Sequence, residues 1–201
     1  GEAGLMGGFS YHRRGKQIIA TFSGFEADLL RSLASQLVEL LRNEVAAPAE
    51  SDDPLEALLD FSGPTTEPED PVLKRLFPSA YGNDEEAAGE FRRFTEGGLR
   101  DGKARAASTI IDSLEEAGLP PELDEDGLVI DVELPIPDAE AWMRSFTDIR
   151  LALATRLGVE EGDEDFWDSL PDDDPAGQVY GIYQWVGILQ ETMVEALWAA
   201  S

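Results

Sequence analysis

The stretch FEADLLRSLASQLVELLRNEV, residues 25–45, repeats apolar residues at the spacing of one face of an α-helix. The apolar positions are Phe25, Leu29, Leu33, Leu37 and Leu40 or Leu41. At 3.6 residues per turn they form a stripe of about five turns, with polar residues on the opposite side. Because such a stripe is stable only when another element covers it, the segment predicts a helix within a packed helical protein.

A second segment, DAEAWMRSFTDIRLALATRLG at residues 138–158, shows the same period after Pro135 and Pro137. We expect this helix to stop at Gly158, because glycine readily takes the left-handed conformation that ends helices. Its buried face is predicted to contain Trp142, Phe146, Ile149, Leu153 and Leu157.

Asp-Pro pairs at 53–54, 70–71 and 174–175 each precede apolar residues at helical spacing. Aspartate accepts hydrogen bonds from the free N–H groups of a first turn, and proline lacks that donor, so the pair marks a helix start. We expect short helices at 54–60, where Asp53 and Glu56 make a capping box, and at 71–76. The last pair predicts a final helix with Ile182, Val186, Leu189, Met193 and Leu197 in line.

Two segments have the character of strands. Residues 9–22, FSYHRRGKQIIATF, carry aromatic and β-branched residues on both sides of a turn containing Gly15, which predicts a hairpin. Residues 128–134, LVIDVEL, alternate apolar and polar side chains with the period of a half-buried strand. We expect that strand to join the hairpin in one sheet.

Residues 84–117 are expected to be helical but do not fit one straight surface helix. On a 100° wheel, Phe91 and Phe94 lie nearly opposite the later apolar group of Ile110, Ile111 and Leu114. Either Gly97, Gly98 and Gly102 mark a kink, or the helix runs through the middle of the fold and changes the side it buries.

The predicted fold is mainly α, of the α+β class. It is a bundle of about five to seven helices with a small antiparallel sheet, formed by the N-terminal hairpin and one later strand. A chain of 201 residues fits a single domain, 1–201. Because Gly1 stands where an initiator Met would, we expect residues 1–8 to be a trimmed or disordered end.

Composition excludes several classes of function. There is no cysteine, so disulfides, thiolate nucleophiles and iron–sulfur clusters are ruled out. The net charge of −27 opposes binding to nucleic acid or to anionic lipid. No run of 18 apolar residues and no signal-peptide pattern is present, so we expect a cytoplasmic protein without a membrane segment.

No catalytic, cofactor-binding or metal-binding residues are predicted. The single histidine, His12, fits a surface position in the hairpin. Residues 122–133, ELDEDGLVIDVE, have the spacing of a calcium loop, but Pro120-Pro121 and a strand-like second half argue against one. Residues 160–175, EEGDEDFWDSLPDDDP, fit a solvated linker anchored by Phe166, Trp167 and Leu170. No phosphate-binding glycine loop is present, and catalysis is unsupported.

One basic cluster stands out in this acidic chain. Residues 90–108, EFRRFTEGGLRDGKARAAS, hold a third of the 15 basic side chains. They are Arg92, Arg93, Arg100, Lys103 and Arg105. Two readings stay open. In one, the cations pair internally with acidic neighbours such as the 160–174 segment. In the other, they form a docking face for an acidic protein partner or for DNA phosphate, the latter disfavoured by the overall charge.

Three blocks together resemble a known family: DPVLKRLFPSAYGNDEEAAGEFRRFTEGGLR (70–100), AWMRSFTDIRLALATRLGV (141–159) and YGIYQWVGILQETMVEAL (180–197). The chain is similar to an actinobacterial domain-of-unknown-function family, often encoded near the ClpS adaptor, that includes AosR-like oxidative-stress transcriptional regulators. The resemblance implies a non-enzymatic regulatory role and supplies no catalytic or ligand residues.

Two functions follow from this resemblance. The first is transcriptional regulation through a protein partner such as a sigma factor or polymerase. The alternative is an accessory factor for Clp- or ClpS-linked proteolysis. A thiol switch is excluded because the chain has no cysteine, and Met6, Met143 and Met193 are poor substitutes, the last two being expected in the core. The oligomeric state does not follow from the sequence.

Overall fold

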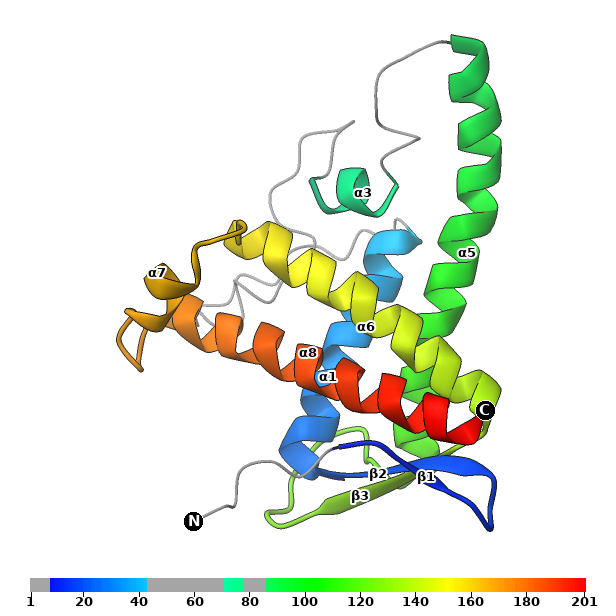
Figure 1. The fold of residues 1–201 in the computed structure, drawn as a ribbon, viewed down its shortest axis with the longest axis vertical. Helices are drawn as coiled ribbons and strands as arrows, with labels where there is room; N and C mark the ends of the chain where they lie inside the picture. Colours follow the sequence, from blue (N-terminus) through cyan, green and yellow to red (C-terminus); the bar gives the residue numbers. More distant parts are fainter. Residues whose placement is uncertain (1–7, 43–70, 78–85) are drawn as a thin grey trace.

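The computed structural model describes residues 8–42, 71–77 and 86–201, and for residues 86–97 it describes the backbone only. Within these ranges the chain forms six helices and one three-stranded antiparallel sheet, which lies at one end of the helices (Figure 1). The prediction of a mainly helical fold with a small sheet is confirmed. The expected helix at 54–60, the capping box of Asp53 and Glu56, and Met6 lie outside the described residues.

The sheet is built as predicted from the hairpin and one later strand. Strand β1 (Ser10–His12) pairs with β2 (Gln17–Ser23), and β2 pairs with β3 (Val129–Leu134), all antiparallel. Ile18 lies opposite Leu134, and Phe22 lies opposite Ile130. These four side chains are buried, while the alternate positions face outward, so the sheet covers the helical core with one face only.

Helix α1 (Gly24–Leu41) begins directly after β2, and its start is fixed by a capping box. The Ser23 hydroxyl accepts from the Glu26 N–H, and the Glu26 carboxylate accepts from the Ser23 N–H. This start turns Gly24 toward the body of the fold and leaves Phe25 71% exposed. The prediction that Phe25 begins the buried stripe is therefore wrong. Leu29 is half-buried, and the later positions are confirmed as buried: Leu33, Leu37, Leu40 and Leu41.

Helix α5 (Glu86–Glu116) is one continuous helix that passes through Gly97, Gly98 and Gly102. It contacts both α1 and α6 (Ile136–Leu157), with Ala104, Ala107, Ile110 and Leu114 buried. These contacts do not place α5 in the middle of the fold, so that part of the expectation stays a prediction. The side chains of Phe91 and Phe94 lie outside the described part, so the change of buried side stays a prediction.

Helices α6 and α8 (Pro175–Ala200) pack along each other, as Figure 1 shows. Helix α6 ends as predicted, because Gly158 takes the left-handed conformation with φ 74°. Helix α8 starts as predicted, with the Asp174 carboxylate accepting from the N–H groups of Ala176 and Gly177. Both predicted stripes face the core, although Leu157, Ile182 and Leu197 are only half-buried.

Two short helices complete the fold. Helix α3 (Pro71–Leu76) lies where the second Asp-Pro pair predicts it, and it packs on α6. Within the acidic segment, residues 164–168 form helix α7 (Glu164–Asp168), which the sequence did not predict. Trp167 is buried and stacks on Tyr180 with ring centroids 5.0 Å apart. Phe166 is 58% exposed, so its predicted role as an anchor is wrong, because the short helix turns only one of the two aromatic rings inward.

The core joins the sheet to the helices through an aromatic cluster of Phe9, Phe22, Trp142 and Phe146. The ring of Phe9 makes an edge contact with Trp142 at 5.7 Å, and Phe22 stacks on Trp142 at 6.2 Å. The indole N–H of Trp142 donates to the Ser113 hydroxyl of α5 at 3.2 Å. One buried side chain thus contacts the sheet, its own helix and α5, and this holds α5 and α6 in their crossing.

Candidate partner-binding groove

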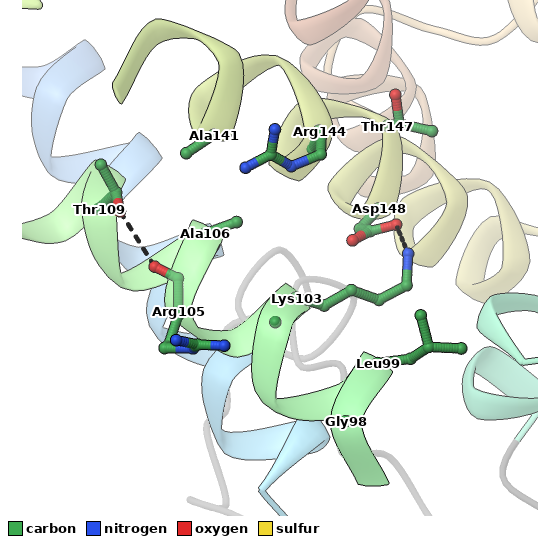
Figure 2. Close-up of a pocket in the computed structure, with 11 residues that line it drawn as sticks. Gly98, Leu99, Lys103, Arg105, Ala106, Thr109, Ala141, Arg144, Thr147 and Asp148 are labelled. Atoms are coloured by element: carbon green, nitrogen blue, oxygen red, sulfur yellow. Dashed lines mark hydrogen bonds and ion pairs between the residues drawn. The ribbon is translucent and has the colours of Figure 1, made fainter. Parts of the chain in front are cut away.

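An open groove of about 640 Å³ lies between α5 and α6 (Figure 2). Its α5 wall includes Gly98, Gly102 and Ala106, and its α6 wall includes Ala141. The small size of these side chains leaves the space between the two helices unfilled. The exposed side chain of Leu99 stands at one end of the groove.

One end of the groove holds a buried ion pair. The Nζ of Lys103 donates to Oδ1 of Asp148 at 2.8 Å, which links α5 to α6. The side chain of Asp148 is only 7% exposed. Burial raises the pKa of this carboxyl above its ordinary value, and the hydrogen bond and positive charge of Lys103 oppose that shift without cancelling it.

Two other cations of the groove are exposed. Arg105 comes from α5, and its 72% exposed side chain bonds Asp101 one turn earlier, at 3.0 Å. Such solvent-exposed pairs stabilise a fold by about 0–1 kcal/mol, so the guanidinium is readily available to another anion. Arg144 comes from α6 and is also exposed, and no ion pair joins it to any described residue. Figure 2 shows the Arg144 guanidinium directed into the space between the helices, whereas the Arg105 side chain lies along α5 at the edge of the groove.

The predicted cluster therefore divides into parts with different roles. Lys103 and Arg105 line the groove, whereas Arg100 reaches back to the Leu41 carbonyl oxygen at 3.3 Å and lies 5.6 Å from the centre of the Phe77 ring. Arg92 and Arg93 belong to the N-terminal half of α5, and their side chains lie outside the described residues. The prediction that they bind a partner stays untested.

Internal pairing of the cluster does occur, but with different acids from those expected. Lys103 pairs with Asp148 and Arg105 with Asp101. The acidic segment lies elsewhere: Glu160, Glu161, Asp163 and Glu164 line a smaller pocket of about 390 Å³ together with Arg75 and Arg150. Figure 1 shows α7 beside the start of α8, away from α5.

The sequence did not point to Arg144, although it is the third cation that lines the groove, beside Lys103 and Arg105. Residues 138–158 were analysed only for the apolar face that α6 buries, and Arg144 lies off that face. Nothing in the sequence brings Arg144 near Arg105, because the crossing of α5 and α6 depends on tertiary packing.

Other residues singled out from the sequence play structural parts. His12 is exposed in the hairpin, as predicted, and its Nδ1 accepts from the Gly15 N–H at 3.0 Å. Residues 129–134 of the calcium-like segment form β3, where Asp131 accepts from the Thr21 hydroxyl. Met193 is buried and Met143 half-buried, in agreement with their expected places in the core. Across the described ranges, no three His, Asp or Glu residues are grouped to hold a metal ion.

Among the described helices, none combines the length and the apolar character that crossing a membrane requires.

The fold is mainly helical with a small sheet, and the family of the chain can be stated. Residues 6–197 match the family described as Domain of unknown function (DUF2017), and the chain belongs to that family. This match covers nearly the whole sequence and confirms the resemblance to an actinobacterial family of unknown function.

Curated relatives carry a regulator's name. The chain is 29% identical to the oxidative stress regulator AosR of Mycobacterium tuberculosis (strain H37Rv), over 92% of this chain and 84% of the relative. It is 31% identical to the putative oxidative stress regulator AosR of Mycobacterium leprae, over 87% of this chain and 79% of the relative. No solved structure matches the chain. The names of these relatives agree with a regulatory role.

Proposed function

We propose that this protein is a non-enzymatic regulator that controls transcription under oxidative stress by binding a protein partner in the groove between α5 and α6. The observation that carries the proposal is the pair of exposed residues, Arg105 and Arg144, that line one open groove of a chain with a net charge of −27. The names of the relatives support the oxidative-stress part of the proposal.

An acidic protein surface fits this groove better than DNA does. The described groove residues comprise three cations and one carboxylate, and Lys103 is already paired with that carboxylate. Specific duplex binding usually requires many phosphate contacts, and the surrounding negative charge opposes them. Two exposed cations are sufficient to orient a few carboxylates of a protein, since charge complementarity across an interface directs encounter and register. A sigma factor or the polymerase is the kind of partner this role needs.

The test is to capture the partner from a native lysate with tagged wild-type protein and with the double variant R105E/R144E. The matched control is R13E/R14E, which reverses two exposed arginines of the hairpin and therefore changes the net charge equally. We expect the groove variant to lose a component of the transcription machinery that the control retains. Reporter genes induced by peroxide should be regulated in cells that carry the wild type or the control R13E/R14E. In cells that carry R105E/R144E this regulation should be lost.

The outcome also decides between the two functions that the sequence leaves open. Equal capture by all three proteins would contradict the proposed groove. Capture of a Clp component in place of a transcription protein would retain the groove but replace transcriptional control with proteolysis. Loss of double-stranded DNA binding in R105E/R144E, without loss of any protein, would assign the groove to nucleic acid.

A further inference from the structure

We infer that the partner element that enters the groove is an amphipathic α-helix, with small or apolar residues along its centre and carboxylates along both edges. The inference rests on the proposed function and specifies the element that is recognised. It follows from three features of the groove: glycines that no contact within the described residues explains, walls made of helices, and cations on opposite sides.

The glycines are the first feature. Gly98 and Gly102 lie inside α5, where each costs about 1 kcal/mol relative to alanine. A Cβ atom built on either glycine meets no other atom within 4 Å. Packing within the described part of the chain therefore does not explain them. With Ala106, they are spaced four residues apart on one side of α5, and they allow the axis of a visiting helix to approach to about 8 Å.

The walls are the second feature. Both belong to helices, whose backbone N–H and C=O groups already bond within each helix. An extended segment laid between them would find no sheet edge and would leave its own backbone groups without partners. A helix satisfies its backbone internally. From Gly98 to Thr109, at 1.5 Å per residue, the α5 wall offers about 17 Å, which is enough for roughly three turns.

The cations are the third feature. Arg105 belongs to the α5 wall and Arg144 to the α6 wall, so the two cations come from opposite walls of the groove. A helix lying between them needs carboxylates on both of its edges and a narrow apolar strip facing Gly102 and Ala106. The exposed side chain of Leu99 supplies an apolar contact at the end of that strip.

The experiment places a photo-crosslinking amino acid at Leu99 in the full chain, with the same replacement at Phe25 as the control. Both positions are exposed, at 57% and 71%, but only Leu99 lines the groove. Mass spectrometry then identifies the crosslinked segment. We expect the amino acid placed at Leu99 to crosslink to an acidic, amphipathic helical segment of the partner. The same amino acid placed at Phe25 should not crosslink to that segment. A crosslink to a neutral, basic or extended segment, to a second copy of this chain, or from both positions alike, would overturn the inference.

A second measurement separates this inference from the proposed function. The captured segment is made as a synthetic peptide, and its affinity is measured for wild type, G102L, G98L and R105E/R144E. Leucine at either glycine fills the groove without changing charge, and both positions have open space around them. We expect about a tenfold or greater loss of affinity in the leucine variants. If only the charge reversal weakens binding, the proposed partner face holds and the helix-in-groove mode is wrong. If neither the leucine variants nor the charge reversal weakens binding, both proposals fail.

Discussion

The ammonium group of Lys103 lies 2.8 Å from a carboxylate oxygen of Asp148, and this contact joins α5 to α6 at the groove. The two partners are not equally buried, since the side chain of Lys103 is 30% exposed and that of Asp148 only 7%. Water can solvate the lysine if its partner is lost, but it can hardly reach the aspartate. Loss of the lysine would therefore leave a buried charge without a partner, whereas loss of the carboxylate would leave a charge that water can still solvate.

We accordingly predict that Lys103→Met destabilises the protein more than Asp148→Asn does. Removing one partner of a fully buried pair costs about 3–5 kcal/mol, and partial access of water should reduce the loss for Lys103→Met to about 1–3 kcal/mol. Asp148→Asn keeps the shape of the side chain and leaves the ammonium partly solvated, so its cost should be smaller. Urea unfolding of both variants at neutral pH measures the order, and a reversed order would contradict the argument.

The raised pKa of Asp148 also predicts that the free energy of unfolding depends on pH. Because burial raises its pKa in the folded chain, the folded state holds this proton more tightly than the unfolded state does. The stability that this proton contributes is fully present below the ordinary aspartate pKa of about 3.9. It is lost as the pH rises through the raised pKa of Asp148 in the folded chain. Relative to Asp148→Asn, the wild type should therefore lose free energy of unfolding as the pH increases from about 4.

The measurement is urea unfolding of both proteins across that pH range. The remaining carboxylates of the chain titrate alike in both proteins, so the difference between the two curves isolates Asp148. A difference that is constant with pH would show that the pKa of Asp148 is not shifted by folding.

The period of apolar residues was sufficient to predict α6, because one stripe runs from Trp142 to Leu153 and a single glycine at 158 ends the helix. The same rule failed at the start of α1. There the capping box of Ser23 and Glu26 sets the first turn, and the close approach of Gly24 to Leu123 and Leu128 decides which side faces inward. Local chemistry at a helix start thus outweighed the general period.

The candidate site was predictable only in part. The concentration of cations on α5 indicated the right helix, since charge is visible in the sequence. Arg144 and Asp148 were not identified, because they lie far along the chain from the α5 residues of the groove, Asp148 being 45 residues from Lys103, and meet them only through the crossing of α5 and α6. With 42 acidic residues, no pattern distinguishes Asp148, the one buried carboxylate within the described ranges.

A matched pair of phenylalanines tests the aromatic core. Phe9 is 6% exposed, touches three aromatic rings and donates its backbone N–H to the Thr192 hydroxyl, whereas Phe25 is 71% exposed. We predict that Phe9→Ala destabilises by about 3–4 kcal/mol, since it removes a buried ring and leaves a cavity. Phe25→Ala should change stability by less than about 0.5 kcal/mol. Thermal and urea unfolding compare the two, and similar losses would contradict the assigned burial.

A second matched pair concerns glycine, and it relates the fold to the groove. At Gly24 an added Cβ would lie 2.9 Å from Leu123 Cδ1 and 3.2 Å from Leu128 Cβ, in a position where the Gly24 N–H also donates to the Leu128 carbonyl oxygen at 2.7 Å. Gly24→Ala should therefore destabilise, by about 1–3 kcal/mol, because the first turn of α1 must move away from the strand entry.

Gly102→Ala should act in the opposite direction. The added methyl group meets no atom within 4 Å, and alanine favours the helix by about 1 kcal/mol, so the free energy of unfolding should rise. Urea unfolding of both alanine variants checks the contrast. If Gly102→Ala is destabilising, α5 contains a contact at this position that the described residues do not show. If it stabilises, the protein retains at Gly102 a residue that the described part of the fold does not favour, and a requirement beyond the described residues, such as the proposed partner, would explain it.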